Sequence, residues 1–358
     1  MNGVESDLCP RVSVALARDL PAWAGSPLAP LRDTGLAHVH VRLVGRGALA
    51  RVPKQSQMAL GPVANLAYQA ACFERAAASG HTPALHGVLP VSAELPRGAL
   101  LVEEIAGRAA TLPRDLGALA RALAAIHALP MARRQERTPL DDAADPLGAL
   151  LGEIEKQAAH LNAANLYAGV RKAIEGELER LRELCRRPAR PAKALIAFDA
   201  HPGNFILRAE GEAVLVDLEK CRYSHPPLDL AHATLYTSTT WDVGSGATLT
   251  AAEVASAYAA WAAALGGPAA PWLAWQMPLR RAMWLWSVTW CIKWRVASRL
   301  PAPAVDRGED WSTENSARVL VEHVRERVDH YLSPAGVARV LAEFNTLQTL
   351  LPDKESRR

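Results

Sequence analysis

The alternation of hydrophobic and polar positions divides the chain into a strand-rich beginning and a helical remainder. Apolar residues at every second position predict a strand over 39–43. Further strands are predicted over 49–52, 86–90 and 99–105, separated by turn residues such as Gly45-Arg46-Gly47. Between the second and third of these strands, residues 62–78 carry apolar side chains at helical spacing. Residues 1–30 contain four prolines and are expected to be irregular, apart from a short helix near 12–17. The beginning of the chain therefore predicts a small sheet with one helix.

After residue 107 the apolar spacing becomes mostly helical. Helices are predicted over 112–129, 147–161, 166–186, 228–236, 251–265, 279–300, 314–331 and 334–350. One β-hairpin interrupts them, with strands at 205–207 and 214–216 around a turn at 209–212. We therefore predict an α+β protein with two lobes. Residues 1–105 form a small β-rich N-terminal lobe, and residues 106–358 form a large, mostly helical C-terminal lobe.

Carboxylate and amide side chains gather at the open end of this hairpin. Asp199 follows the apolar run 194–198, and Asn204 directly precedes the first strand. Asp217 and Glu219 follow the second strand. Because the two strands of a hairpin start and end at the same edge, these side chains are expected to lie close together. Hard oxygen ligands of this kind suit Mg²⁺, which takes one or two carboxylates together with phosphate oxygens and water.

Composition narrows the class of protein. The chain has 358 residues, half of them apolar and 22% charged, which is typical of a soluble globular protein of about two domains. Its 40 basic and 37 acidic residues give a net charge of +3, too balanced to indicate nucleic acid as a main partner. No signal-peptide pattern opens the chain, and charged residues interrupt the apolar stretch 272–300, so a membrane span is not expected. Five scattered cysteines without zinc-ligand spacing favour a cytoplasmic protein with reduced thiols.

Three motifs around the hairpin resemble one known family. They are Asp199-Ala200-His201-Pro202-Gly203-Asn204, Val216-Asp217-Leu218-Glu219 and Pro227-Leu228-Asp229-Leu230-Ala231. Together they resemble the aminoglycoside phosphotransferase and choline kinase-like family, and the resemblance covers most of the chain. It implies a protein-kinase-like fold with two lobes, and transfer of the γ-phosphate of ATP to a hydroxyl group of a small molecule.

The resemblance also implies a role for each hairpin residue. Asp199 corresponds to the catalytic base that accepts the proton of the acceptor hydroxyl, and His201 lies where related kinases place a cation near the γ-phosphate. Asn204 and Asp217 correspond to the Mg²⁺ ligands, and Glu219 to a residue that assists the second metal ion. Such a set suits phosphoryl transfer, which depends mainly on positioning and charge neutralisation.

The same resemblance places ATP in the N-terminal lobe. The loop that contains Gly35 is expected over the phosphates, because glycine allows close approach of the backbone. Arg51 aligns with the phosphate-contacting basic residue of the family, and Lys54 is the competing candidate. Backbone groups of Glu103 and Ile105 are expected to meet the adenine.

Departures from the family pattern keep two other hypotheses open. Ala197-Phe198 stands where the family usually has His-Gly, and Gln69 stands where a helix carboxylate usually pairs with the basic strand residue. A pseudokinase-like protein that binds nucleotide or acts as a scaffold, without transfer activity, is therefore the main alternative. A metal hydrolase is another, since His225 and His232 flank the acidic residues, although their spacing matches no familiar zinc site.

The motifs leave the acceptor open among aminoglycosides, choline-like amines, sugars and amino-acid alcohols. Trp286, Trp290 and Trp294 lie four residues apart, on one face of a predicted helix. They indicate either a packed core or an aromatic wall for a cationic or ring-bearing acceptor. The expected partner is thus a small hydroxyl compound, with no nucleic acid and no membrane, and the protein is expected to be a monomer or homodimer.

Overall fold

The computed structural model describes residues 3–31, 37–242, 246–298 and 318–351. These residues fall into two compact units. The first unit comprises the described parts of 1–77, 82–106 and 301–324. The second comprises the described parts of 78–81, 107–300 and 325–358.

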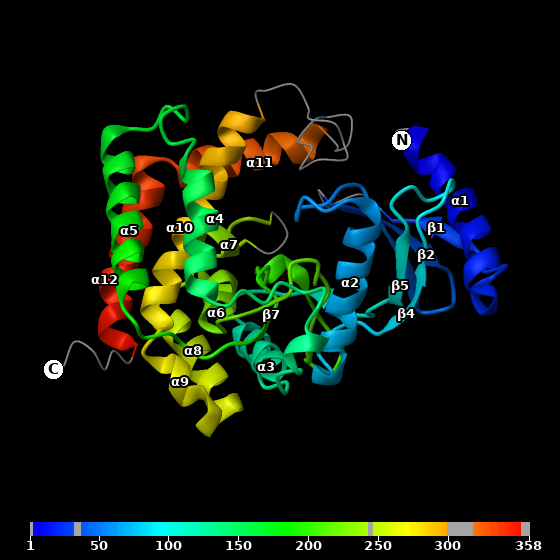
Figure 1. Ribbon diagram of the computed structural model, residues 1–358, viewed down its shortest axis with the longest axis horizontal. Coiled ribbons are helices and arrows are strands. Elements are labelled where there is room, and N and C mark those ends of the chain that lie inside the picture. Colours follow the sequence, from blue (N-terminus) through cyan, green and yellow to red (C-terminus); the bar gives the residue numbers. More distant parts are fainter. Residues whose placement is uncertain (1–2, 32–36, 243–245, 299–317, 352–358) are drawn as a thin grey trace. The chain divides into compact units, whose positions relative to one another are not determined.

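A five-stranded antiparallel sheet forms the centre of the first unit (Figure 1). In spatial order its strands are β1 (Leu28–Pro30), β2 (His38–Leu43), β3 (Ala48–Pro53), β5 (Ala99–Glu103) and β4 (Leu85–Leu89). Gly45 and Gly47 both adopt a left-handed backbone in the turn from β2 to β3, a conformation that glycine reaches without steric cost. The four strands predicted for this part of the chain are confirmed.

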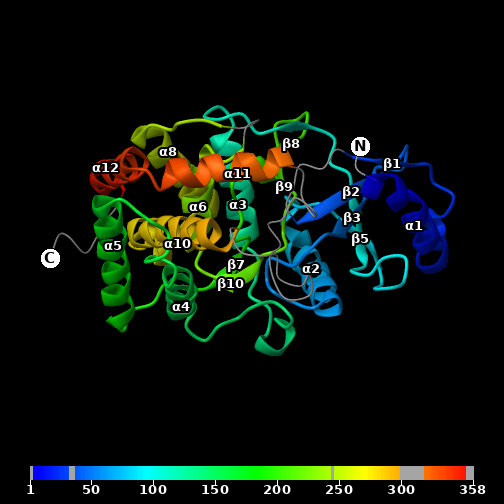
Figure 2. The same ribbon diagram turned by 90° about the horizontal axis from the view of Figure 1, so that it is seen from above.

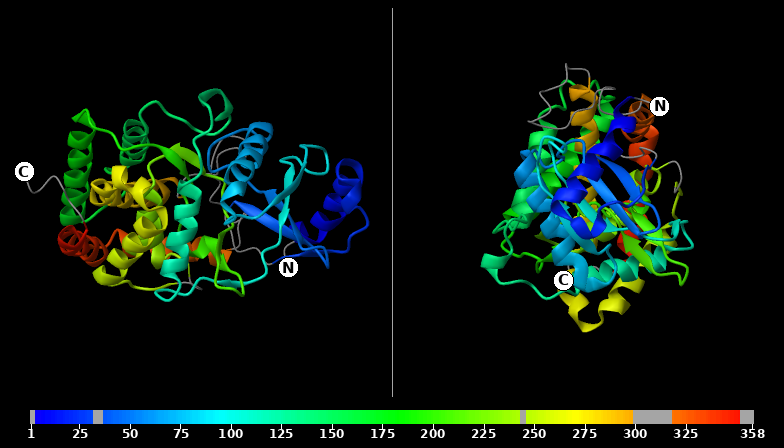
Figure 3. Two further views of the ribbon diagram at one scale, coloured as in Figure 1. Left: turned by 90° about the horizontal axis from the view of Figure 1, so that it is seen from below. Right: turned by 90° about the vertical axis from the view of Figure 1, so that its right-hand side faces the viewer.

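Two helices cover opposite faces of this sheet (Figures 2 and 3). Helix α1 (Gly3–Asp19) buries Val12 and Leu16 in a cluster with Val41 and Leu101 of the sheet. Helix α2 (Pro62–Ala76) covers the other face. The prediction that the first thirty residues are irregular is wrong, because α1 continues through Pro10. A proline lacks the N–H donor that a helix interior uses, so Pro10 argued against a helix here. The helix forms because its apolar residues are buried against the sheet.

The second unit is mostly helical, as predicted. Its helices are α3 (Leu116–His127), α4 (Pro146–Ala158), α5 (Ala168–Arg186), α6 (Pro227–Thr234), α7 (Tyr236–Thr239), α8 (Ala251–Leu265), α9 (Ala270–Leu273), α10 (Gln276–Ala297), the end of α11 (Arg318–Tyr331) and α12 (Pro334–Leu350). Short 3₁₀ turns in the two units span Pro21–Trp23, Ala77–Ser79, Arg134–Glu136, Pro202–Asn204 and Gly267–Ala269. Helix α10 lies at the centre and packs against α4, α5, α6 and α12. Among the described helices, none combines the length and apolar character that a membrane span requires.

Helix α8 begins at the position that its sequence predicts. Thr250 Oγ1 accepts a hydrogen bond from the backbone N–H of Glu253 at 3.2 Å, and the Glu253 carboxylate accepts from the backbone N–H of Thr250 at 2.7 Å. This reciprocal pair is a capping box, which satisfies two donors that the first turn of a helix leaves open.

Two short ladders in the second unit carry the acidic residues. Strands β8 (Phe205–Leu207) and β9 (Ala213–Leu215) form the predicted hairpin, and β6 (Arg108–Ala109) adds a third strand beside β8. The sequence did not predict the second ladder, in which β7 (Ala194–Ile196) pairs antiparallel with β10 (Arg222–Ser224). The segment from Asp199 to Asn204 joins β7 to β8, and the segment from Asp217 to Lys220 joins β9 to β10. The two ladders therefore bring these connecting segments side by side.

Candidate active site

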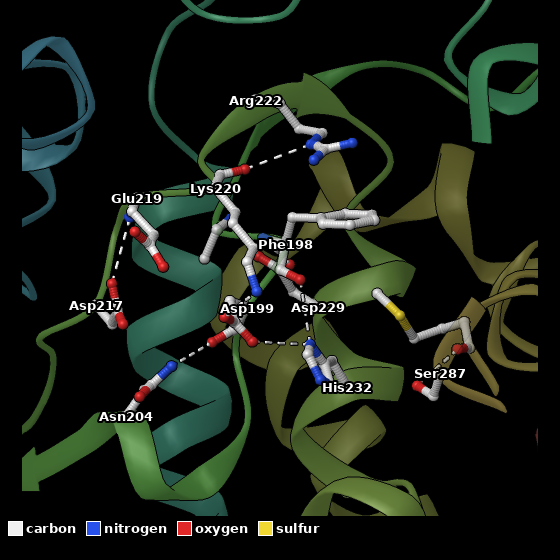
Figure 4. A network of polar contacts seen from close by, with 12 residues as sticks. Phe198, Asp199, Asn204, Asp217, Glu219, Lys220, Arg222, Asp229, His232 and Ser287 are labelled. Carbon is white, nitrogen blue, oxygen red and sulfur yellow. Dashed lines mark hydrogen bonds and ion pairs between the residues drawn. The ribbon is translucent and has the colours of Figure 1, made fainter. Parts of the chain in front are cut away.

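A buried carboxylate fixes the loop that carries Asp199 (Figure 4). Asp229, near the start of α6, accepts hydrogen bonds from the backbone N–H groups of Ala197 at 2.7 Å and Phe198 at 2.8 Å. Each amide uses a different oxygen of the carboxylate, and Asp229 has no exposed surface. The backbone immediately before Asp199 is therefore held by two charge-assisted hydrogen bonds.

Asp229 is held in turn by a histidine from α3. His127 donates its Nε2–H to Asp229 Oδ2 at 3.0 Å, and its Nδ1 accepts from the indole N–H of Trp261 at 3.0 Å. An indole nitrogen can only donate, so Nδ1 is the unprotonated nitrogen and the proton resides on Nε2. All three side chains are buried. Helices α3, α6 and α8 thus support the loop together.

Phe198 occupies the position where the family usually has glycine, and its backbone has the conformation that glycine favours. Its φ angle is +61°, in the left-handed region, where a side chain costs about 1–2 kcal/mol. The ring is buried beneath the guanidinium group of Arg222, at 3.8 Å, and meets Trp286 edge to face at 5.2 Å. The loop conformation is therefore compatible with a bulky residue whose ring packs on both sides.

The predicted Mg²⁺ ligands lie on one side of Asp199 (Figure 4). Asn204 donates its side-chain N–H to the backbone carbonyl of Asp199 at 2.8 Å, which turns its amide oxygen the other way. Asp217 Oδ1 accepts the backbone N–H of Glu219 at 3.4 Å, and the Glu219 side chain is buried. Within the described ranges, no group of three or more His, Cys, Asp and Glu side chains is arranged to hold a metal ion. Two carboxylates and one amide oxygen still fit Mg²⁺, which takes its remaining ligands from phosphate and water.

Two further side chains, those of Lys220 and His232, lie beside the Asp199 carboxylate. The position of Lys220 was not predicted from the sequence. Lys220 donates to Asp199 Oδ2 at 2.7 Å, and His232 Nδ1 lies 3.8 Å from Asp199 Oδ1. Burial is the largest single effect on Asp199 and raises its pKa, but Lys220 together with the nearby His201 and His232 holds that pKa below its ordinary value. Burial lowers the pKa of His232 to about 4, so this imidazole is neutral at physiological pH.

His201 and Gly203 complete the loop. The Nδ1 atom of His201 is buried and has no hydrogen-bond partner among the described residues. A Cβ atom at Gly203 would lie 2.7 Å from a carboxylate oxygen of Asp242 and 3.0 Å from the His201 ring. A larger residue would require the side chain of Asp242 or His201 to move, whereas glycine fits the loop as it stands. It also places Asp242 against the loop.

The tryptophans of α10 have different surroundings. Trp294 is buried, whereas Trp286 and Trp290 are half-buried. Trp286 donates its indole N–H to Glu153 at 3.2 Å and packs against Phe198, so it supports the loop that carries Asp199. Trp290 packs edge to face on Trp241 at 5.7 Å. The three residues therefore do not form one continuous wall.

In the first unit, Arg51 is connected to helix α2 through a histidine. Arg51 on β3 donates to His38 Nδ1 at 3.2 Å, and His38 Nε2 lies 3.0 Å from the Gln69 amide oxygen. Because arginine can only donate, His38 carries its proton on Nε2 and donates it to Gln69. All three side chains are buried. A chain of hydrogen bonds thus stands where the family usually has an ion pair between strand and helix.

The other predicted nucleotide-binding residues of this unit lie near strand ends. Lys54 follows β3 and donates its backbone N–H to the Ala37 carbonyl at 2.8 Å. Glu103 ends β5 and donates its backbone N–H to the Ala84 carbonyl at 2.8 Å. Ile105 is buried two residues later. Gly35 lies outside the described residues.

The structure therefore gathers the predicted residues in two places. Asp199, Asn204, Asp217 and Glu219 are neighbours in the second unit. The His201 ring lies 6.1 Å from that of His232, which is itself beside Asp199. Arg51, Lys54, Glu103 and Ile105 belong to the first unit, as the two-lobe organisation requires. Lys220 is the functional candidate that sequence reasoning missed. Its only signal was a basic residue directly after the Asp-Leu-Glu motif.

Comparison with known proteins provides a family match and a set of similar structures. The family model described as the phosphotransferase enzyme family matches residues 38–275. These residues include β2, the loop that carries Asp199 and helix α8. None of the curated protein sequences matches the chain.

Several solved structures share the fold at low sequence identity. A choline/ethanolamine kinase family protein from Mesorhizobium loti is 17% identical, with a TM-score of 0.57 over 95% of this chain and 99% of its own. An ethanolamine kinase from Plasmodium vivax is 11% identical, with a TM-score of 0.59 over 91% of this chain and 88% of its own. The aminoglycoside phosphotransferase APH(2″)-IIia, solved with GDP and kanamycin, is 14% identical, with a TM-score of 0.55 over 89% and 97%. The fold is therefore protein-kinase-like, as predicted.

Proposed function

Because the chain belongs to the phosphotransferase enzyme family, we propose that it transfers the γ-phosphate of a nucleoside triphosphate, ATP in the first instance, to a hydroxyl group of a small molecule. The observation that carries the proposal is the fixed loop. Asp229 holds the backbone before Asp199, and the oxygen ligands of Asn204 and Asp217 lie beside that carboxylate. Positioned groups of this kind are what phosphoryl transfer requires.

In this mechanism Asp199 is the base. The acceptor hydroxyl donates its hydrogen bond to the Asp199 carboxylate and gives up its proton as the new O–P bond forms. The bond between the γ-phosphorus and the bridging oxygen breaks, and the nucleoside diphosphate leaves with that electron pair. A carboxylate with a lowered pKa is ionised at neutral pH, as a proton acceptor must be.

Asn204 and Asp217 would hold Mg²⁺, with Glu219 assisting a second ion. When bound, Mg²⁺ would neutralise the charge on the phosphate oxygens. The unpartnered Nδ1 of His201 supports a position near the transferred phosphate, since a buried nitrogen of this kind suits a polar ligand. In the first unit, Arg51 would contact the phosphates, with Lys54 as the second candidate and Gly35 in the covering loop. The Glu103 carbonyl and the Ile105 N–H would bind the adenine.

The acceptor belongs to a broad class of small hydroxyl compounds. Similar structures come from ethanolamine kinase and from an aminoglycoside phosphotransferase solved with kanamycin, so amino alcohols and aminoglycosides are the first compounds to test. The half-buried Trp290 and Trp241 would offer aromatic surface to a cationic or ring-bearing acceptor. GTP should be tested beside ATP, because the aminoglycoside phosphotransferase was solved with GDP.

The test is nucleotide-dependent transfer by the purified protein and its Asp199→Asn variant. We expect release of nucleoside diphosphate with at least one compound of a hydroxyl panel, and loss of about 10²–10⁴-fold in turnover in the variant. Nucleotide binding in the presence of Mg²⁺, measured by thermal shift, should be unchanged in the variant. Asp329→Asn is the matched control, since Asp329 is 63% exposed and lies in the same unit.

The main alternatives give different results. A pseudokinase-like protein would bind nucleotide without turnover in any acceptor reaction, and Asp199→Asn would leave its binding function intact. A metal hydrolase would release phosphate or acid from its substrate without a nucleoside triphosphate. Full activity of the Asp199→Asn variant would refute the assignment of the base.

A further inference from the structure

Lys220 forms an ion pair with one of the two carboxylate oxygens of the proposed base, Asp199. Its ammonium group donates to Asp199 Oδ2 at 2.7 Å, and both side chains are only 13% exposed (Figure 4). At this depth an ion pair between two side chains is strongly directional, because water competes little for either group. The contact is therefore part of the architecture of the site, unlike an ion pair on the protein surface.

Strand pairing explains why Lys220 reaches this position. In the antiparallel ladder of β7 and β10, Ile196 lies opposite Arg222. Lys220 comes two residues before Arg222 and Asp199 three residues after Ile196, so both lie just beyond the same end of this ladder. Arg222 anchors the same strand through an ion pair with Glu153 at 2.6 Å and through its contact with the Phe198 ring. The backbone on both sides of the ion pair is thus fixed.

The other oxygen of the base has a different environment. Asp199 Oδ1 lies 3.8 Å from His232 Nδ1, which is beyond hydrogen-bond distance. His232 uses that nitrogen instead to donate to the Phe198 carbonyl at 3.1 Å. Oδ1 is therefore the oxygen that is available to an acceptor hydroxyl, whereas Oδ2 is covered by Lys220.

We infer that Lys220 is a positioning residue for the proposed transfer reaction. Its ammonium group fixes the rotation of the Asp199 carboxylate, so that Oδ1 faces the acceptor hydroxyl and Oδ2 does not compete for it. Its charge also balances Asp199 beside the carboxylates of Asp217 and Glu219. The inference rests on the proposed function, since it assumes that Asp199 accepts the proton of the acceptor.

A double-mutant cycle tests this role, with Mg²⁺·ATP and water as the acceptor. Lys220→Met should lower kcat about 10²-fold, the scale of loss that follows a misplaced reacting group, while KM for ATP stays within about threefold. Lys220→Arg keeps the charge with a different shape and should recover part of that loss. In the Asp199→Asn background, Lys220→Met should change kcat by less than about threefold, because the residue acts through Asp199.

Stability is measured beside activity, because Lys220→Met leaves a buried carboxylate unpaired and such changes are strongly destabilising. The double variant Asp199→Asn/Lys220→Met removes both charges and should recover thermal stability. If Lys220→Met does not fold, Lys220→Arg takes its place in the same cycle, with an expected loss of about tenfold in kcat that disappears in the Asp199→Asn background. Lys172→Met, an exposed lysine of α5, is the matched control.

Failure of the inference and failure of the proposed function give different results. Wild-type kcat in Lys220→Met, or a loss of the same size in both backgrounds, would overturn the positioning role and leave Asp199 as the base. Wild-type turnover in Asp199→Asn, or no turnover of nucleotide by the wild-type protein with water or any acceptor, would overturn the proposed function and this inference with it.

Discussion

At the scale of single residues, Phe198 shows how packing can outweigh backbone strain. A left-handed backbone costs a phenylalanine about 1–2 kcal/mol, whereas removal of a buried aromatic side chain typically costs about 3–5 kcal/mol. The ring lies between Arg222 and Trp286, so the stabilisation from its packing exceeds the cost of the backbone strain. The departure from the usual His-Gly pair therefore does not by itself indicate a disordered loop.

Substitution of Phe198 separates these two effects. Phe198→Gly should destabilise the protein by about 2–4 kcal/mol, because the loss of packing exceeds the relief of strain. Phe198→Ala should be less stable than Phe198→Gly by about 1 kcal/mol, since alanine keeps the strain at φ +61°. Urea unfolding of the two variants measures the difference.

The sign of that difference is the diagnostic result. At an ordinary backbone position glycine is the less stable residue by about 0.5–1 kcal/mol, because it loses more freedom on folding. A Phe198→Ala variant that is more stable than Phe198→Gly would therefore contradict the left-handed conformation. Phe198→Ala and Phe198→Gly lose the same aromatic packing, so each variant is the control for the other.

At the scale of elements, the chain from Arg51 through His38 to Gln69 connects two strands to helix α2. Arg51 and His38 lie on neighbouring strands and point to the sheet face that α2 covers. The histidine connects the Arg51 guanidinium group to the Gln69 amide through two hydrogen bonds, in which Arg51 and His38 are the donors. It thereby fixes the guanidinium group that is proposed to contact the nucleotide phosphates.

Removal of this histidine should weaken nucleotide binding. We expect His38→Ala to raise the dissociation constant for Mg²⁺·ATP about tenfold, because one lost charged-group hydrogen bond corresponds to about 1.5 kcal/mol. Titration calorimetry measures the constant. His86→Ala is the control, since His86 on β4 is exposed and belongs to the same unit. Equal affinities of the two variants would show that Arg51 does not depend on His38.

The elements also show how far a sequence predicts this structure. The hairpin of β8 and β9 was predicted because its two short apolar runs and the turn at Gly211 between them are local signals. The contact of Lys220 with Asp199 was not, since it depends on the register of β7 and β10, whose three-residue strands carry no clear alternation. Helix α1 was missed for a related reason. Its stability comes from burial against a sheet that lies later in the chain.

At the scale of the whole molecule, the stability of the second unit depends on two buried histidines that remain neutral. Burial lowers the pKa of both His225 and His232 to about 4, from an ordinary value of 6.5. His225 donates Nδ1–H to the Ala192 carbonyl at 3.1 Å. Its Nε2 is buried without a hydrogen-bond partner among the described residues. Protonation of Nε2 would therefore place a buried N–H and a positive charge without an acceptor, which is unfavourable.

This arrangement predicts loss of stability in mild acid. Between pH 6.5 and about 4 the unfolded chain protonates these histidines and the folded chain does not, so the unfolded state binds more protons. Stability is therefore greatest above pH 6.5 and falls as the pH drops through this window. Each histidine contributes a slope of about 1.4 kcal/mol per pH unit, measured as the change in the free energy of unfolding in urea.

One substitution isolates the contribution of His225. His225→Asn retains a donor at the position of Nδ1 for the Ala192 carbonyl but does not titrate in this range. Its slope between pH 6 and pH 4.5 should be smaller than that of the wild-type protein by about 1.4 kcal/mol per pH unit. His86→Asn, at an exposed position, should keep the wild-type slope, which separates the effect of burial from that of losing any histidine. An unchanged slope in His225→Asn would mean that His225 is protonated equally in the folded and unfolded states, and would place the acid sensitivity elsewhere in the molecule.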